Sequence, residues 1–265
     1  MKEKNKILLA GPWIGEFGWE LFCWQGYVRF HSDKFDKVKI IGRPGHRILY
    51  EDFCDEYIEF DPCSFNTDMF MCHGSKTYNH LLKEIPHTHY LDGQFNIGIQ
   101  NTIKGLIDRK NIFFKEQKFK KYKSDSLDYS FDIIFHCRNK TVGPERNWSK
   151  SQWVDLYEEL KSDYNIACIG NDESFYIDGT KDLRNISLSD LCSVFNRSKL
   201  IVGPSSGPMH LASLSGLKHL VWSTEYNKVR YERDWNPLNT EVIFYDKEGW
   251  NPSPSKIKDI ITNII

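Results

Sequence analysis

Short apolar runs that end in glycine alternate with stretches of helical period along this chain. Lys6–Ala10 (KILLA) and Val38–Ile41 (VKII) are such runs, followed by Gly11 and Gly42, and their length and apolar character predict buried strands. A helix is predicted between them, over about Trp19–Phe30, after a Gly-rich turn. The first part of the chain therefore predicts a strand, a loop, a helix and a strand, in that order.

The second part of the chain repeats this alternation more regularly. One helix is predicted where apolar residues recur at helical spacing, at Trp153, Leu156, Tyr157 and Leu160. A second is predicted over 188–196, with Ser187 and Asp190 spaced as a capping box, and a third over 207–216. The predicted strands are Phe131–Phe135, Asn165–Ile169, Lys199–Val202 and His219–Trp222. Strands alternating with helices at this spacing imply parallel β-α-β units.

The chain length and pattern favour two domains. A chain of 265 residues lies between one large domain and two small ones. Residues 64–89 show no clear period, and no element is assigned to them. We place the boundary in the charged segment around 115–130, which gives 1–122 and 123–265 as two α/β domains of Rossmann type, the second the better defined.

Composition and charge narrow the class of protein. The 35 Lys and Arg nearly balance the 36 Asp and Glu, so a dedicated nucleic-acid binder is not expected. The seven Cys are odd in number and form no CxxC pair, which fits reduced thiols. Neither a signal-peptide core nor an apolar stretch of about 20 residues is present. We expect a cytoplasmic globular protein.

The strongest basic run is Lys115–Lys123 (KEQKFKKYK). Such a run is most often an exposed helix face or a linker, and less often it contacts a phosphate-rich or membrane surface. A peripheral membrane contact is therefore kept as an expectation.

The strongest chemical signal lies in Leu200–Gly216, where a buried strand meets a turn of small residues and then a helix. The amide groups and positive dipole end of a helix N-terminus favour an anion such as phosphate. The candidate binding residues are Ser205, Ser206, Gly207, Pro208, Met209 and His210. The alternative is purely structural, with Ser205 as the helix N-cap and His210 as a half-buried ring whose hydrogen bonds are satisfied.

This run, with Gly-Pro-Met-His-Leu-Ala over 207–212, resembles the donor-site signature of the ADP-heptose–lipopolysaccharide heptosyltransferases, glycosyltransferase family nine. The family run usually carries Asp where Ser205 stands here. The resemblance implies that the run binds the diphosphate of a nucleotide-sugar. It also implies a GT-B-like fold, in which two Rossmann-type domains face a central cleft.

Three further segments are similar to the family in the same order. They are Arg146-Asn-Trp148 before a helix, Gly170-Asn-Asp-Glu173 after a strand, and Leu188-Ser-Asp-Leu191 before the next strand. With the donor-site run, they extend the resemblance over about 130–225. Gly170 joins the candidate donor-binding residues through this match.

Glu16 lies in a Gly-rich loop between the first strand and the first helix (GPWIGEFGWE), where such a fold exposes side chains to the ligand. The family carries a Gly-Asp pair in the corresponding loop, and the resemblance implies that Glu16 is the base that deprotonates the acceptor hydroxyl. The alternative is an acid that interacts with the helix N-terminus. Glu20, one turn further along the predicted helix, is the rival base.

Arg138 and Lys140 follow the predicted strand Phe131–Phe135, at the edge where doubly wound sheets bind ligands. Both could neutralise a departing diphosphate. A plain surface role for Lys140 stays open.

We therefore expect a glycosyltransferase that moves a sugar from a nucleoside-diphosphate sugar to a hydroxyl of a glycan or lipopolysaccharide-type acceptor. The resemblance implies inversion. No cofactor or metal is expected, and the chain contains neither the Asp-x-Asp triplet that holds a divalent cation in GT-A enzymes nor a P-loop. The alternatives are a nucleotide- or glycan-binding protein with a degenerate site, and a GT-B-like sugar-nucleotide epimerase.

Overall fold

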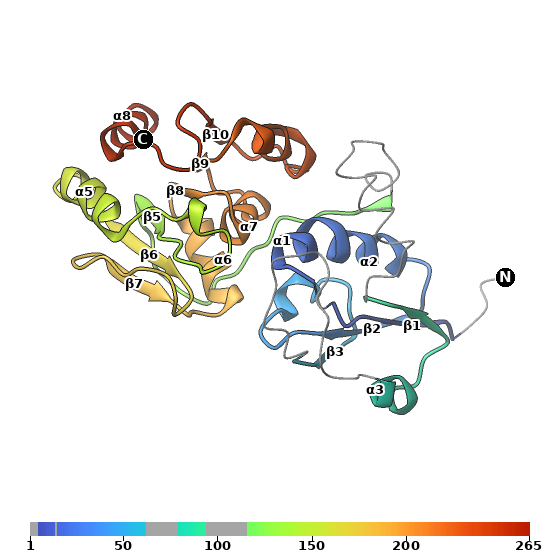
Figure 1. Cartoon of the computed structure of the whole chain (residues 1–265). Helices are drawn as coiled ribbons and strands as arrows, with labels where there is room; N and C mark the ends of the chain where they lie inside the picture. Colours follow the sequence, from blue (N-terminus) through green and yellow to red (C-terminus); the bar gives the residue numbers. More distant parts are fainter. Residues whose placement is uncertain (1–4, 14, 62–78, 94–115) are drawn as a thin grey trace. The chain divides into compact units, whose positions relative to one another are not determined.

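The computed structural model of the chain describes residues 5–13, 15–61, 79–93 and 116–265. The chain divides into two compact units, Met1–Phe119 and Lys120–Ile265 (Figure 1). The backbone shows why the division falls there. Lys118 N donates to Gly26 O at 3.0 Å, whereas Tyr122 N donates to Leu214 O at 2.9 Å. Residues 117–123 form no helix, so within the described part of the basic run the chain is a connecting segment.

Unit 1 is built on a four-stranded parallel sheet of order β3-β2-β1-β4. Its strands are β1 (Ile7–Ala10), β2 (Lys37–Gly42), β3 (Glu56–Glu59) and β4 (His89–Leu91). The first long helical segment covers one face of this sheet, and α3 (Asn79–Glu84) lies on the other (Figure 1). On the α3 face, buried Leu9, Ile41 and Phe60 pack with Leu81, Leu82 and Ile85. Residues 62–78, part of the stretch left unassigned from sequence, lie outside the described residues.

The first helix contains a wide turn that its sequence pattern does not reveal. It runs as α1 (Phe17–Trp19), the π-helical turn η1 (Glu20–Trp24) and α2 (Gln25–Ser32). The Gln25 amide donates to the Glu20 carbonyl, one residue further back than in an α-helix. All five side chains of η1 are buried, including the carboxylate of Glu20. The helix predicted over 19–30 is confirmed, with both ends extended.

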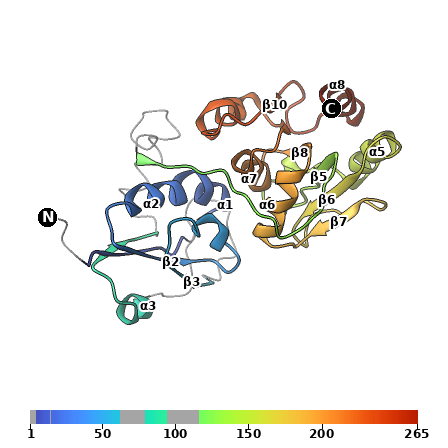
Figure 2. The same cartoon turned by 180° about the vertical axis from the view of Figure 1, so that it is seen from behind.

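Unit 2 is built on a six-stranded parallel sheet of order β10-β9-β8-β5-β6-β7. Helices α5 and α8 cover one face and α6 and α7 cover the other, as Figures 1 and 2 show from opposite sides. The strands are β5 (Ile133–His136), β6 (Ile166–Gly170), β7 (Lys181–Arg184), β8 (Leu200–Pro204), β9 (His219–Trp222) and β10 (Val242–Tyr245). The helices are α5 (Lys150–Leu160), α6 (Leu188–Arg197), α7 (Gly207–Ser215) and α8 (Pro254–Ile264).

The predicted strands and helices of the second part are confirmed to within about two residues at most ends, as is usual for element boundaries. The sequence pattern missed the two edge strands, β7 and β10, and the last helix, α8. In β7 (KDLR) only Leu183 is buried, and β10 is only half-buried throughout. Edge strands face solvent on one side, so their sequences lack the continuous apolar run that identifies a central strand.

The core under α5 and α8 is centred on three tryptophans. Trp148, Trp153 and Trp222 are fully buried, and the rings of Trp148 and Trp222 stack with centroids 4.5 Å apart. Residues from four central strands and from α8 surround them, among them Ile133, Phe135, Val202, Leu220 and Ile257. This core fixes the strand ends from which the loops of the candidate site emerge.

Side-chain caps set the starts of two of these helices. Ser149 and Gln152 form a reciprocal capping box at the start of α5. At α6, Ser187 Oγ accepts a hydrogen bond from Asp190 N at 3.0 Å, as predicted. The Asp190 carboxylate accepts a hydrogen bond from the Ser187 hydroxyl, whereas in a full capping box it would accept one from the Ser187 backbone amide. Among the residues that the structure describes, no helix is long and apolar enough to cross a membrane.

Candidate active site

The carboxyl ends of three neighbouring strands bring the candidate donor-binding residues of unit 2 to one sheet edge. Strand β5 pairs with β8 on one side and with β6 on the other. Arg138 lies in the loop after β5, Ser205 lies directly after β8, and Gly170 is the last residue of β6. A Cβ on Gly203 would lie 3.0 Å from the Cβ of His136, so the β5 and β8 loops start in close contact. This edge is where parallel α/β sheets bind ligands.

The turn between β8 and α7 is held by Tyr231. The Tyr231 hydroxyl donates to Ser205 Oγ at 3.0 Å and accepts from the Ser206 amide at 3.1 Å. The N-cap of α7 is Ser206, and its side chain makes no capping hydrogen bond. The alternative in which Ser205 caps this helix is therefore wrong, because the buried Ser205 hydroxyl is engaged by Tyr231.

Ser206 presents a hydroxyl that the fold leaves without a partner. Its Oγ is enclosed and forms no hydrogen bond to any described residue. It sits at the start of α7, where the first amide groups of a helix lack acceptors within the helix, and Pro208 supplies no N–H. Gly207 and Met209 are thus the first-turn amide donors beside the hydroxyl. An enclosed donor at a helix N-terminus is suited to a phosphate oxygen.

His210 lies below this turn as part of an aromatic stack. Its ring stacks on Tyr231 with centroids 4.4 Å apart and meets Trp235 edge-on at 4.7 Å. Burial, followed by the charges of Arg230 and His219, holds the pKa of His210 well below its ordinary value. The ring is buried, not half-buried, and at neutral pH it carries no charge with which to bind a diphosphate.

Arg138 and Lys140 have different surroundings. Arg138 is buried, and its guanidinium donates to the carbonyls of Val142 at 2.6 Å and Gly143 at 3.0 Å and also to Asn147 Oδ1. It therefore shapes the loop after β5. Lys140 is exposed, and its ammonium pairs with no described residue. Lys140 is the cation that this loop leaves available to a ligand.

The positive charge at this edge affects the pKa of the neighbouring His136. Burial, followed by the charges of Lys140 and Arg138, lowers the pKa of His136 to about 3. The same two cations that disfavour a protonated histidine favour an anion near the end of β5.

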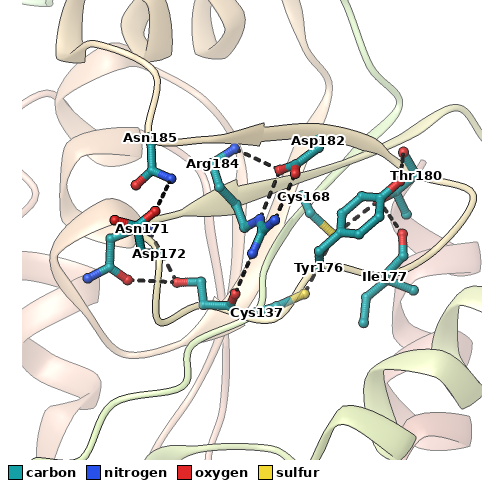
Figure 3. A network of polar contacts seen from close by, with 11 residues as sticks. Cys137, Cys168, Asn171, Asp172, Tyr176, Ile177, Thr180, Asp182, Arg184 and Asn185 are labelled. Carbon is teal, nitrogen blue, oxygen red and sulfur yellow. Dashed lines mark hydrogen bonds and ion pairs between the residues drawn. The ribbon is translucent and has the colours of Figure 1, made fainter.

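The turn after β6 needs a glycine at 170. Gly170 has a φ of +144°, and a Cβ there would lie 2.1 Å from Ser174 Oγ. Ser174 Oγ donates to Asn171 Oδ1 at 3.1 Å, and Arg184, paired with Asp182 at 2.8 Å, donates to the Ser174 carbonyl at 3.0 Å (Figure 3). This network accounts for the glycine structurally, and its role in donor binding stays a prediction.

We expect Gly170→Ala to lower the free energy of unfolding by about 2–4 kcal/mol, because a positive φ and a steric clash act together. Gly249→Ala is the matched control. Gly249 has a φ of +60° with open space around its Cβ position, so only the backbone cost of about 1–2 kcal/mol applies. Urea denaturation measures both. Equal losses would contradict the contact with Ser174.

In unit 1, the Gly-rich loop after β1 lies against the loop after β2. Arg43 Nη2 donates to Gly15 O at 3.2 Å. The Glu16 carbonyl accepts from Trp13 Nε1 at 3.2 Å and from the Glu20 amide at 3.0 Å. Glu16 is half-buried at the N-cap of α1, and its side chain makes no capping bond. Glu16 thus stands at the carboxyl edge of this sheet, as predicted, and its role as a base stays a prediction.

Glu20 is surrounded by donors. Its Oε2 lies 2.8 Å from His46 Nδ1, and its Oε1 accepts from the Tyr50 hydroxyl at 2.7 Å. Burial raises the pKa of Glu20, but the charge of His46, the hydrogen bonds from His46 and Tyr50 and the charge of Arg43 outweigh burial, and the net pKa is lowered. Glu20 is therefore a buried, ionised carboxylate that acts on its neighbours and is not exposed to a ligand. Sequence reasoning missed His46, which no motif singles out.

Two Rossmann-like α/β units, each built on a parallel sheet with candidate site residues at its carboxyl edge, are the architecture of the GT-B fold. No protein-family model matches this sequence, and no curated protein matches it either. In the described parts of the chain, no three His, Cys, Asp or Glu side chains form a cluster that could hold a metal ion.

The fold is similar to those of several solved glycosyltransferase structures. The chain is similar to a family nine glycosyltransferase from Veillonella parvula at 12% identity, with a TM-score of 0.57, covering 100% of this chain and 93% of that one. It is similar to the E. coli ADP-heptose LPS heptosyltransferase II at 13% identity, with a TM-score of 0.58 and 98% coverage of both chains. It is also similar to E. coli heptosyltransferase WaaC with ADP, at 12% identity and a TM-score of 0.56, covering 98% of this chain and 100% of that one. The resemblance to this family is confirmed at the level of the fold.

Proposed function

We propose that this protein is a glycosyltransferase that moves a sugar from a nucleoside-diphosphate sugar to a hydroxyl of a glycan acceptor. The observation that carries the proposal is the enclosed, unbonded Ser206 hydroxyl at the N-terminus of α7. It lies at the ligand-binding edge of a sheet in a GT-B fold. The similar WaaC structure holds ADP, which supports a nucleoside diphosphate as the ligand class.

In the proposed reaction, the bond between the anomeric carbon and the diphosphate oxygen breaks as the acceptor oxygen bonds to that carbon with inversion. The first-turn amides of α7, the Ser206 hydroxyl and Lys140 stabilise the negative charge that develops on the departing diphosphate. Arg138 acts by holding the loop that carries Lys140. We propose that this charge compensation needs no metal ion.

A base at the carboxyl edge of the unit 1 sheet takes the proton of the acceptor hydroxyl. Glu16 is the candidate that the family resemblance supplies, and it stands at this edge. The acceptor class that we propose, a glycan of the lipopolysaccharide type, is supported by a similar protein whose described activity is on LPS.

A nucleotide that binds at this site is expected to stabilise the protein against thermal unfolding. Thermal unfolding is measured with ADP, GDP, UDP, TDP or CMP at about 100 times the dissociation constant, where a ligand adds roughly 2.7 kcal/mol of stability. One nucleotide is expected to stabilise the protein, and Ser206→Ala is expected to lose most of the shift because the phosphate loses an enclosed donor.

Ser253→Ala is the matched control. Ser253 is the exposed N-cap of α8 and also makes no side-chain capping bond, but it follows the edge strand β10, which lies two strands away from β8 in the sheet. The Ser253→Ala protein should keep the full nucleotide response. If no nucleotide stabilises the wild-type protein, the transferase proposal fails, and a glycan-binding protein becomes the better description.

A further inference from the structure

The carboxyl edge of the unit 1 sheet carries a histidine paired with a buried carboxylate. His46 lies in the loop after β2, directly before η2 (Arg47–Leu49), and Nδ1 of its ring is 2.8 Å from Glu20 Oε2. The Glu20 side chain is 1% exposed and that of His46 is 18% exposed. The carboxylate therefore approaches the ring from the interior, and the ring reaches the surface.

The second nitrogen of the His46 ring is uncommitted. Nε2 bonds no atom of the described residues, and it is not among the enclosed polar atoms that lack a partner. When Nδ1 donates its proton to this carboxylate, an uncharged ring carries its lone pair on Nε2. Glu20 is also tied by the Tyr50 hydroxyl at 2.7 Å, so its position does not depend on His46 alone.

His46 belongs to the same cluster of loops as Glu16. The ring of Phe17, the residue after Glu16, meets the His46 ring edge-on with centroids 5.4 Å apart. Arg43, three residues before His46, donates to Gly15 O. The loop after β2 thus places His46 beside the loop after β1, at the edge where the acceptor hydroxyl is expected.

Two tyrosine hydroxyls beside this pair are engaged in hydrogen bonds. The Tyr50 hydroxyl donates to Glu20, and the Tyr57 hydroxyl donates to the Arg43 carbonyl at 2.6 Å. Glu20 sits in the π-helical turn η1, and such turns occur frequently at functional sites. This turn directs the carboxylate toward His46.

We infer that His46, oriented by Glu20, is the group that removes the proton from the acceptor hydroxyl, in place of Glu16. The inference rests on the proposed transfer reaction. As the acceptor oxygen bonds to the anomeric carbon and the diphosphate leaves, the hydroxyl proton passes to His46 Nε2. The ring becomes a cation, and the negative charge of Glu20 at 2.8 Å from Nδ1 stabilises it. His46 is then the catalytic residue and Glu20 the positioning residue.

The test compares His46→Gln, Glu20→Gln and Glu16→Gln with the control His89→Gln. His89 is exposed at the start of β4, on the opposite edge of the same sheet. Release of nucleoside diphosphate is measured with sugars of the stabilising nucleotide as donors and a panel of methyl glycosides as acceptors. Thermal stabilisation by the nucleotide is measured on every variant.

His46→Gln is expected to lower kcat about 100-fold or more with little change in KM for the donor, since positioned general bases contribute that much. Nucleotide stabilisation should be unchanged, because that site lies in unit 2. In Glu20→Gln, nitrogen NMR of labelled histidine should show the His46 ring shared between both tautomers, with reduced kcat. A purely structural role for Glu20 would not move the ring proton.

Turnover of His46→Gln within about threefold of His89→Gln would overturn the inference, as would a larger loss in Glu16→Gln than in His46→Gln. These outcomes are distinct from failure of the proposed function. If the wild-type protein binds no nucleotide and releases none from any donor, the transfer reaction itself is refuted, and the assignment of His46 as its base falls with it.

Discussion

Acidification from pH 7 to pH 5 is expected to destabilise unit 2 by on the order of 6 kcal/mol. Burial lowers the pKa of His136 to about 3 and that of His219 to about 4, and burial with the charges of Arg230 and His219 holds that of His210 well below the ordinary 6.5. Below about pH 6.5 these histidines bind protons in the unfolded chain but not in the folded chain. Each of them therefore lowers the free energy of unfolding by about 1.4 kcal/mol per pH unit. The stability that these neutral histidines contribute is therefore fully present above pH 6.5, and it falls with decreasing pH until the folded pKa of each histidine is reached.

Urea denaturation at a series of pH values, followed by circular dichroism, measures this loss. His219→Gln should reduce the difference in unfolding free energy between pH 7 and pH 5 by about 2 kcal/mol, because the variant lacks one histidine that is protonated only in the unfolded chain. The exposed His89→Gln should leave the difference unchanged. A His219→Gln protein with the wild-type pH dependence would contradict the explanation by buried neutral histidines.

Replacing Trp222 by Ala is expected to lower the free energy of unfolding of unit 2 by about 3–5 kcal/mol. The Trp222 ring is fully buried and stacks on the Trp148 ring with centroids 4.5 Å apart. The centroids of the Trp222 and Trp153 rings are 5.6 Å apart. Its removal leaves a cavity that two rigid neighbouring rings cannot fill. Urea denaturation at pH 7 measures the loss.

Two variants bracket this prediction. Trp222→Phe retains an aromatic ring and should lose clearly less than Trp222→Ala. Tyr226→Ala, four residues along, removes a side chain that is 80% exposed and should change stability by less than about 0.5 kcal/mol. A Trp222→Ala protein as stable as Tyr226→Ala would show that the tryptophan cluster contributes little to the core.

The central elements of both sheets follow from local patterns. Runs such as Ile7–Ala10 in unit 1 and Leu200–Val202 in unit 2 are largely buried within a parallel sheet, so each of their positions is apolar and the strand is visible in the sequence. The edge strand β7 carries three charged residues, none of them buried, and its assignment depended on its pairing with β6.

The candidate donor site shows the same division. The order strand, small-residue turn and helix predicts the candidate phosphate-binding turn, because this order is a property of neighbouring residues. Which hydroxyl is available was decided by Tyr231, 25 residues beyond Ser206, which occupies Ser205 and leaves Ser206 Oγ without a partner. Local sequence does not contain that choice.

By itself, then, the sequence determined the alternation of strands and helices, the small-residue turn before α7 and the acidic loop after β1, because each depends on residues adjacent along the chain. Only the tertiary structure decided the roles of Arg138 as a loop anchor, of His210 as a neutral buried ring, and of His46 as the partner of Glu20. These roles depend on burial and on pairs such as Glu20 and His46, 26 residues apart, which folding alone brings within hydrogen-bond distance.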